Sequence, residues 1–371
     1  IDLVPGSLPF HFRPYRYPPE TQKEIERQIK IMLDQNIIRE SESEFASPIV
    51  MVPKADKKSW RFAIDYRSLN KMTKKRVFHL PNIQELLDLM GSKKYYTSMD
   101  MQSGFMQIPM STEDIDKTAF ISHLGIYEFI TMPFGLTAAP DTFQRVMNSL
   151  RRRLTAAMLI YLDDIIIGSE TEEMHLIDIE NFLKLLKEVG LKLKMDKCHW
   201  GMAEIRYLGF LLSERGIRMD PRQVQTVQNF KPPKSLTELK SLLGALTYFR
   251  RFIKNFAHIA RPLQTLIEGK IEENWGKEQD ESLNLLKNLL TSAPVLQSPR
   301  FGKPFTIECD ASKKAIGAVL FQEKGPVAYA SRALNRHETN YPSIEREALA
   351  LVYAVKEFSP YIIGSGVTKI I

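Results

Sequence analysis

Three aspartates stand in segments that otherwise have the composition of buried β-strands. Asp163 and Asp164 lie back to back in "MLIYLDDIIIGS", and Asp100 ends the strand-like segment "YYTSMDM". Burying neighbouring ionised carboxylates is costly unless cations neutralise them. Mg²⁺ prefers oxygen ligands and usually takes one or two protein carboxylates together with substrate phosphates. The pattern therefore predicts a metal site at Asp100 and Asp163, provided that the two strands lie side by side.

The two adjacent aspartates are not expected to be equivalent. Successive strand residues face opposite sides of a sheet, so Asp163 and Asp164 cannot both point straight at one site. We expect Asp163 to be exposed at the surface for metal together with Asp100, and Asp164 to be an accessory ligand. Paired aspartates also occur in ordinary turns, which is the alternative interpretation of the motif taken alone.

The composition is that of a globular protein with a basic bias. The chain has 371 residues, of which 44% are hydrophobic and 26% charged, and a net charge of +7. No run approaches the roughly 18 apolar residues that span a bilayer, so we expect no membrane segment. Two cysteines are too few for a disulfide framework and favour a reducing compartment. Between Arg222 and Arg261 basic residues are frequent and Glu238 is the one acid, which favours a polyanionic partner.

Hydrophobic periodicity predicts strands interleaved with helices and hairpins, which is typical of an α+β domain. The main expected elements are helices at 20–38, 81–90, 137–154, 176–193 and 343–358, hairpins at 47–67 and 205–219, a helical region from 221 to about 290, and strands at 303–312, 317–322 and 327–334.

Five ordered segments carry a family resemblance. They are "FASPIVMVPKADKKSWRFAIDYRSLN", "SMDMQSGFMQI", "MPFGLTAAPDTFQRVMN", "YLDD" and "YLGFLLSERGI". Together they resemble the polymerase of a gypsy-class LTR retrotransposon, an RNA- and DNA-templated DNA polymerase. The resemblance implies a right-hand polymerase followed by a truncated α/β ribonuclease H-like domain. The implied parts are an N-terminal extended arm (1–19), mainly fingers (20–95), palm with part of the fingers (96–220), a helical thumb and connection (221–292) and an incomplete ribonuclease H-like domain (293–371).

The resemblance also implies roles for the palm residues. Asp100, Asp163 and Asp164 match the metal-binding triad, and Met101 matches the position that lends a backbone carbonyl. Two Mg²⁺ or Mn²⁺ ions are implied, with attack of a primer 3′-hydroxyl on the α-phosphate of a dNTP.

Nucleotide-binding residues are implied in the fingers and beside the palm. Lys54 and Arg61 match residues that hold the incoming triphosphate, although a solvated basic hairpin is the alternative. Phe105 matches the bulky position that excludes a 2′-hydroxyl, although an isolated aromatic is more often a core residue.

Primer and template contacts are implied by two further segments. Leu208, Gly209 and Phe210 match the hairpin that grips the primer end, but Phe210 could equally be a packing residue. In the thumb, an apolar helical stripe is expected to be buried, with a basic face opposite it that contacts the phosphate backbone. The stripe consists of Phe249, Phe252, Ile253 and Phe256, and the basic face of Arg250, Arg251 and Lys254.

The C-terminal section resembles the start of a ribonuclease H domain in "FTIECDAS" and "SIEREALALVYAV". Asp310 ends a strand, and Glu347 shares a helical face with Ile344, Leu351, Ala354 and Phe358, so we expect Glu347 on a buried face. The resemblance implies that Asp310 and Glu347 are catalytic carboxylates of this domain, which would serve in the longer protein. The chain stops in the strand that should deliver the third carboxylate. We therefore expect no ribonuclease H activity from these residues.

The implied partners are RNA/DNA and DNA/DNA primer–templates and dNTPs. The resemblance is also compatible with a homodimer, and it implies a cytoplasmic location in virus-like particles. One alternative is an RNA-dependent RNA polymerase, against which Phe105 argues. Another is a domesticated, non-catalytic nucleic-acid-binding protein. Domestication should erode the carboxylates, yet all three palm aspartates are present.

Overall fold

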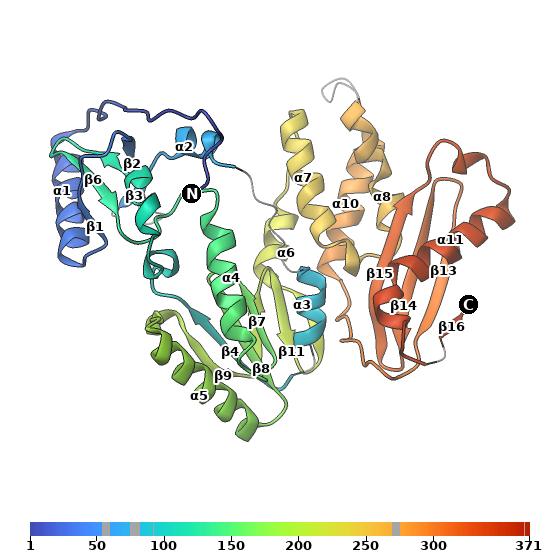
Figure 1. Cartoon of the computed structure of the whole chain (residues 1–371). Coiled ribbons are helices and arrows are strands. Elements are labelled where there is room, and N and C mark those ends of the chain that lie inside the picture. The colour runs from blue at the N-terminus through green and yellow to red at the C-terminus, as the bar shows by residue number, and fades with distance from the viewer. Residues whose placement is uncertain (54–59, 75–81, 92, 269–274, 367) are drawn as a thin grey trace. The chain divides into compact units, whose positions relative to one another are not determined.

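The computed structural model describes residues 1–53, 60–74, 82–91, 93–268, 275–366 and 368–371 (Figure 1). The chain forms two compact units, each drawn from three segments. The first comprises Ile1–Pro81, Thr97–Ile167 and Glu172–Trp200, and the second comprises Asn82–Tyr96, Gly168–Thr171 and Gly201–Ile371. Both units mix helices with sheets, as the sequence predicts. Within the described residues, no helix is both long and apolar enough to cross a membrane.

The first unit contains a five-stranded sheet, in the order β1-β6-β5-β2-β3, and most of a four-stranded sheet, in the order β7-β8-β4-β9. Its strands are β1 (Ile38–Glu40), β2 (Ser47–Pro53), β3 (Trp60–Ile64), β4 (Tyr95–Asp100), β5 (Phe120–Ile121), β6 (Ile126–Phe129), β7 (Met158–Tyr161), β8 (Asp164–Ser169) and β9 (His199–Met202). Its helices are α1 (Pro19–Asp34), α2 (Arg67–Met72), the 3₁₀ turn η1 (Gly104–Gln107), α4 (Ala139–Arg151) and α5 (Glu172–Val189). Strands β4, β8 and β9 carry residues of both units.

The predicted N-terminal helix and the first hairpin are confirmed. Helix α1 buries Ile25, Ile29 and Met32, which are spaced one helical turn apart. Strands β2 and β3 pair antiparallel, with Val52 opposite Arg61. These elements follow from local periodicity, because the apolar residues repeat at helical spacing in one segment and strand propensity is high in the other.

The four-stranded sheet is buried along its central strands. In β7 and β8 the apolar residues on both sides of the turn are at most 3% exposed, which explains why the segment reads as one continuous hydrophobic run. Helix α5 is tied to β4 by a hydrogen bond of 2.8 Å between Thr97 Oγ1 and His175 Nε2, both buried. Burial also lowers the pKa of His175. This polar contact fixes β4, the strand that delivers Asp100.

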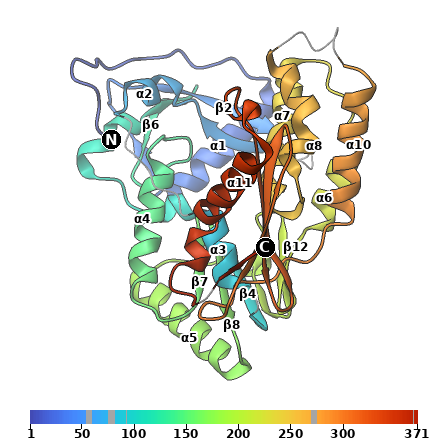
Figure 2. The same ribbon diagram turned by 90° about the vertical axis from the view of Figure 1, so that its right-hand side faces the viewer.

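The second unit combines a three-stranded sheet, a helical region and a four-stranded sheet ordered β15-β14-β13-β16. Its strands are β10 (Glu204–Tyr207), β11 (Phe210–Ser213), β12 (Gly216–Met219), β13 (Thr306–Ala311), β14 (Ala315–Gln322), β15 (Gly325–Ala333) and β16 (Lys369–Ile370). Its helices are α3 (Ile83–Met90), α6 (Pro221–Gln228), α7 (Leu236–Tyr248), the 3₁₀ turn η5 (Arg250–Phe252), α8 (Phe256–Gln264), α10 (Lys277–Thr291), α11 (Ser343–Glu357) and α12 (Ser359–Ile362). Figure 2 shows α11 beside the strands of the second sheet, and α11 packs on β13 and β14.

The segment between α7 and α8 differs from the single helical stripe expected for it. All four apolar residues of that stripe are buried, as predicted, with exposures of 1% to 4%. The helix is nevertheless interrupted, because α7 ends at Tyr248, η5 follows, and Asn255 adopts a left-handed φ of 58° before α8 begins. Side chains on either side of this break therefore do not keep a common helical register.

Candidate active site

The strands that carry the three aspartates are neighbours in one sheet. Asp100 is the last residue of β4, Asp164 is the first residue of β8, and β4 lies beside β8. Asp163 occupies the turn between β7 and β8, where Tyr161 pairs with Asp164. The expected adjacency of the two strands is confirmed, and it brings the carboxylates close enough for their charges to interact.

The turn itself is held by a residue that the sequence analysis missed. Leu162 has a φ of 56°, a left-handed conformation that is strained for a leucine. Gln144 of α4, which is 1% exposed, donates from Nε2 to the Ile160 carbonyl at 3.0 Å and accepts from the Leu162 N–H at 2.8 Å. A single buried amide thus fixes both sides of the turn beside Asp163. Its only sequence signal is a glutamine within the buried stripe of an amphipathic helix.

The two adjacent aspartates have different environments. Asp163 is half-buried, and its Oδ1 is a buried atom with no hydrogen-bond partner among the described residues. Asp164 has the more exposed side chain. Asp163 is therefore only partly exposed, and its role as a metal ligand stays a prediction. A buried carboxylate oxygen without a donor is a group that a cation would satisfy.

Burial and mutual repulsion raise the pKa of both adjacent carboxyls. For Asp163 the largest cause is desolvation, followed by the negative charges of Asp100 and Asp164. For Asp164 the causes are desolvation by the surrounding protein and then the charge of Asp100. Perturbed carboxyls of this kind concentrate at functional sites.

A lysine that the sequence analysis did not single out moderates this repulsion. Lys197 Nζ lies 3.2 Å from Asp100 Oδ2 and donates a hydrogen bond to it. Its positive charge also lowers the pKa of Asp163 and Asp164, against the larger effects that raise it. Lys197 ends a short 3₁₀ turn and lies 97 positions from Asp100 in the chain, so no local pattern reveals the pairing.

The site is suited to a divalent cation shared with a substrate. Over the ranges that the structure describes, no group of three or more His, Cys, Asp or Glu side chains could hold a metal ion by itself. Asp100 and Asp163 stay the predicted pair of donors, and the Oδ1 of Asp163 is buried without a hydrogen-bond partner among the described residues. Mg²⁺ commonly binds through one or two carboxylates and completes its shell with water and phosphate oxygens.

Gly104 allows the Asp163 carboxylate to occupy its position. A Cβ added at Gly104 would lie 2.8 Å from Asp163 Oδ1 and 3.0 Å from the ring of Phe143. The next residue, Phe105, is 9% exposed, and its ring centroid lies 5.3 Å from that of Phe143 and 5.0 Å from that of Phe134. Phe105 is thus a packed aromatic beside the acidic site, and its steric role toward a ribose stays a prediction.

The remaining residues expected near a nucleotide are only partly described. Lys54 lies outside the described residues. Arg61 is exposed on β3, next to the end of the hairpin. Met101 follows β4 directly, is 3% exposed and forms an isolated antiparallel bridge with Leu193. Its expected carbonyl contribution to a metal stays a prediction.

The hairpin expected to grip a primer is a tight two-residue turn. Leu208 and Gly209 both have positive φ, 47° and 81°, between the paired residues Tyr207 and Phe210. The hydroxyl of Tyr248 donates to the Leu208 carbonyl at 2.7 Å. Phe210 is 2% exposed and packs against the rings of Tyr248, Phe249 and Phe252, so its side chain serves packing. The predicted contact with a primer would therefore be made by the backbone of Leu208 and Gly209.

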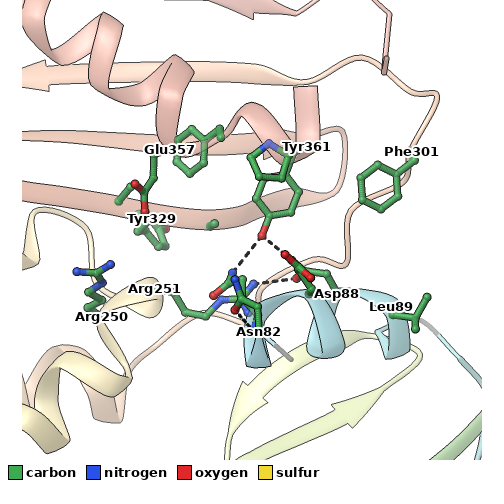
Figure 3. A pocket seen from close by; sticks show the side chains of 15 residues that line it. Asn82, Asp88, Leu89, Arg250, Arg251, Phe301, Tyr329, Glu357 and Tyr361 are labelled. Atoms are coloured by element: carbon green, nitrogen blue, oxygen red, sulfur yellow. Dashed lines mark hydrogen bonds and ion pairs between the residues drawn. The ribbon is translucent and has the colours of Figure 1, made fainter. Parts of the chain in front are cut away.

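The expectation that Arg251 projects from a basic face is wrong. Arg251 is buried, and its Nη2 lies 3.1 Å from Asp88 Oδ1 of α3, with both side chains 7% exposed (Figure 3). Tyr361 of α12 donates to the same carboxylate, and burial together with the Asp88 charge raises the pKa of that tyrosine. Removing one partner of such a pair would leave a buried charge. Arg250 and Lys254 are exposed, as expected.

The two carboxylates expected in the ribonuclease H-like section have separate surroundings. Asp310 is exposed and accepts a hydrogen bond from Asn255 Nδ2 at 3.1 Å. Glu347 is also exposed, and Ile344 and Leu351 on its helical face are 75% and 41% exposed. The expectation of a buried face at Glu347 is therefore wrong. The buried residues of α11 are Ala350 and Ala354, so the expected face is covered at Ala354 but not at Glu347.

Two family descriptions match the chain. Residues 52–212 match "Reverse transcriptase (RNA-dependent DNA polymerase)", and residues 275–369 match "RNase H-like domain found in reverse transcriptase".

Drosophila melanogaster retrovirus-related Pol polyproteins are similar over nearly the whole chain. The chain is 37% identical to that of transposon opus over 98% of its length, 40% to that of transposon 297 over 96%, and 35% to that of transposon gypsy over 92%. It spans 38%, 34% and 35% of these relatives, respectively.

Solved structures of the foamy viral protease-reverse transcriptase have a similar fold. The dRH form in complex with double-stranded DNA has a TM-score of 0.88 and 26% identity, covering 98% of this chain and 64% of that chain. The complex with RNA/DNA hybrid has a TM-score of 0.81 and 26% identity, covering 99% and 50%. The fold expected from the sequence resemblance is thereby confirmed.

Substituting Gly104→Ala should displace the Asp163 carboxylate, because the flexible carboxylate yields more easily than the Phe143 ring. We expect catalytic turnover to fall by roughly 100-fold, the order of loss caused by a misplacement of about 1 Å. Turnover and thermal unfolding are measured together with those of Gly244→Ala, where the added Cβ meets nothing. Unchanged turnover in Gly104→Ala would contradict the role of Gly104 in positioning the Asp163 carboxylate.

Asp163→Asn should stabilise the metal-free protein at neutral pH. The folded-state pKa of Asp163 is raised, so its ionised form opposes folding at high pH, and protonation relieves this penalty as the pH falls through the raised pKa. We expect the midpoint of thermal unfolding to rise by roughly 2 °C at pH 7.5 and the gain to vanish below the ordinary carboxyl range. Asp34→Asn, at the exposed end of α1, is the control. A gain that grows as the pH falls would refute the stated origin.

Proposed function

The chain belongs to the reverse transcriptase family of retrotransposon Pol polyproteins, and from this premise we propose that it extends a primer 3′-hydroxyl with dNTPs on RNA or DNA templates. The observation that carries the proposal is the buried, unpartnered Oδ1 of Asp163, in the turn that leads into the strand beside the one ending in Asp100. Such an arrangement is costly for folding and is suited to cation-assisted transfer of a nucleotide.

The carboxylates bind and orient in this mechanism. Asp100 and Asp163 would hold two Mg²⁺ or Mn²⁺ ions, with Asp164 and the Met101 carbonyl as accessory ligands. When bound, the ions supply the charge that activates the primer hydroxyl and neutralises the leaving pyrophosphate. Gln144 keeps the turn rigid, so the Asp163 carboxylate need not reorganise when substrate arrives.

Other residues would bind the nucleotide and the nucleic acid. Arg61 and Lys54 would pair with the triphosphate, and Phe105 would exclude a 2′-hydroxyl. The exposed Arg250 and Lys254 would contact the phosphate backbone, which is supported by nucleic-acid complexes of the foamy viral enzymes named above. We assign the arm, fingers, palm, thumb and ribonuclease H-like parts to the residue ranges expected from the sequence.

The ribonuclease H-like section is proposed to be silent in this chain. Asp310 is engaged by Asn255, and Glu347 lies on the exposed side of α11. Nuclease chemistry of this type requires several carboxylates that converge on metal ions. The proposed cellular setting is the cytoplasm, within virus-like particles, and a homodimer is compatible with it.

The polymerase proposal is tested with purified protein, primer–template, dNTPs and Mg²⁺ or Mn²⁺. We expect extension by the unaltered chain, a loss of at least about 1,000-fold in Asp163→Asn and a smaller loss in Asp164→Asn. NTPs should be incorporated far more slowly than dNTPs. Full activity of Asp163→Asn would refute the assigned mechanism. Binding of primer–template without any extension would favour a non-catalytic nucleic-acid-binding protein.

The proposed lack of nuclease activity is tested by incubating the protein with an RNA/DNA hybrid that carries a labelled RNA strand and measuring cleavage of that strand. No metal-dependent cleavage is expected under conditions that support primer extension. Cleavage that disappears in Asp310→Asn would overturn this part of the proposal.

A further inference from the structure

Helix α8 packs on the face of the C-terminal sheet to which Asp310 belongs. Asp310 pairs with Gly317 across β13 and β14, and Gly317 pairs with Ser331 across β14 and β15. All three positions meet the start of α8. Asn255 Nδ2 donates to Asp310 Oδ2 at 3.1 Å, and the Ala257 N–H donates to Ser331 Oγ at 2.9 Å. Alternate residues of the same strands form the core with α11, so α8 and α11 cover opposite faces.

The central position of this contact is a glycine, whose missing side chain leaves room for the Asn255 amide. A Cβ added at Gly317 would lie 2.3 Å from Asn255 Oδ1. A glycine in the interior of a strand weakens the strand and often marks a close approach of another part of the chain. The amide of Asn255 therefore spans two strands, with its nitrogen on Asp310 and its oxygen over Gly317.

The backbone at Asn255 is also specialised. Its φ of 58° is left-handed, a conformation that asparagine adopts more readily than other residues with a Cβ. Glycine would accommodate the turn equally well, but it would lose the amide. A further hydrogen bond, from Arg261 Nη1 to the Lys314 carbonyl at 3.0 Å, ties the next turns of α8 to the loop before β14.

The space left beside Asp310 is small. A cavity of about 150 Å³ lies between α8 and the strands, with His258 and Asp310 among its lining residues. It can hold a few water molecules, each of which takes up about 30 Å³ in the liquid.

We infer that α8 holds the ribonuclease H-like domain in a docked, nuclease-silent state, in which Asp310 accepts a docking hydrogen bond instead of binding a metal. Asn255 and Gly317 form the latch. In this state the carboxylates do not fit a metal site, because Asp310 is shared with Asn255 and Glu347 lies on the exposed side of α11. Release of α8 would free the Asp310 carboxylate from this hydrogen bond. The inference rests on the proposed nuclease role of Asp310.

The latch is tested in the full 371-residue chain with three variants: Gly317→Ala, Asn255→Gly and the double variant. Hydrogen–deuterium exchange of α8 and β14 reports docking, and carbodiimide labelling of Asp310 reports access to its carboxylate. We expect Gly317→Ala to speed exchange by roughly tenfold and to increase labelling, because its Cβ strikes the Asn255 amide. Asn255→Gly keeps the turn and should raise both readouts less.

The double variant decides whether the latch is specific. With the Asn255 side chain gone, the methyl group added at position 317 meets no clash, so the double variant should exchange like Asn255→Gly alone. Equal damage from Gly317→Ala in both backgrounds would overturn the latch, as would an Asn255→Gly variant that matches the unaltered protein in both readouts. Gly244→Ala controls for the added methyl group.

Neither readout requires catalysis. Primer extension by the same variants reports separately on the proposed polymerase, so failure of the latch and failure of the polymerase assignment give different results.

Discussion

Repulsion between carboxylates in a partly buried site is the constraint on which the first unit depends. Asp163 is held beside Asp100 and Asp164, and desolvation adds to the repulsion among them. A flexible turn would relieve this repulsion by swinging a carboxylate into water. The buried strands β7 and β8 and the Gln144 amide prevent that movement. The sheet therefore keeps a high density of negative charge in place. Lys197 neutralises part of this charge, and in the proposed mechanism metal ions neutralise the rest.

The sequence predicts the features that depend on local periodicity and on the order of the strands. The β2–β3 hairpin, the helices α1, α4, α5 and α11, and the adjacency of β4 and β8 were all predictable in this way. The residues that hold the three aspartates in place were not predictable from the sequence. Gln144 and Lys197 act on partners far away in the chain, and their residue types are common in ordinary helices and loops. The need for a glycine at position 104 was equally hidden, because it follows only from the position of the Asp163 carboxylate in the folded protein.

The wrong predictions for Arg251 and Glu347 share a physical cause. Both inferred the burial of a side chain from its position on a helical wheel alone. Arg251 was placed on a solvated face by assuming one continuous helix, whereas the break before α8 turns it toward Asp88. Glu347 was placed on a buried face because its neighbours on the wheel are apolar. Of those neighbours, Ile344 and Leu351 are exposed in this structure whereas Ala354 and Phe358 are buried, so apolar character alone did not establish whether the helix is covered at Glu347.

The discontinuous make-up of the two units bears on how the chain folds during synthesis. Every segment of the first unit has been made once Trp200 emerges, so that unit can fold early. Helix α3 belongs to the second unit, most of which follows Gly201, and its Leu86, Leu87 and Met90 are buried in the fold. The ribosome therefore makes this apolar helix well before most of the unit to which it belongs. That interval is when premature aggregation threatens and when a chaperone has a hydrophobic segment to bind.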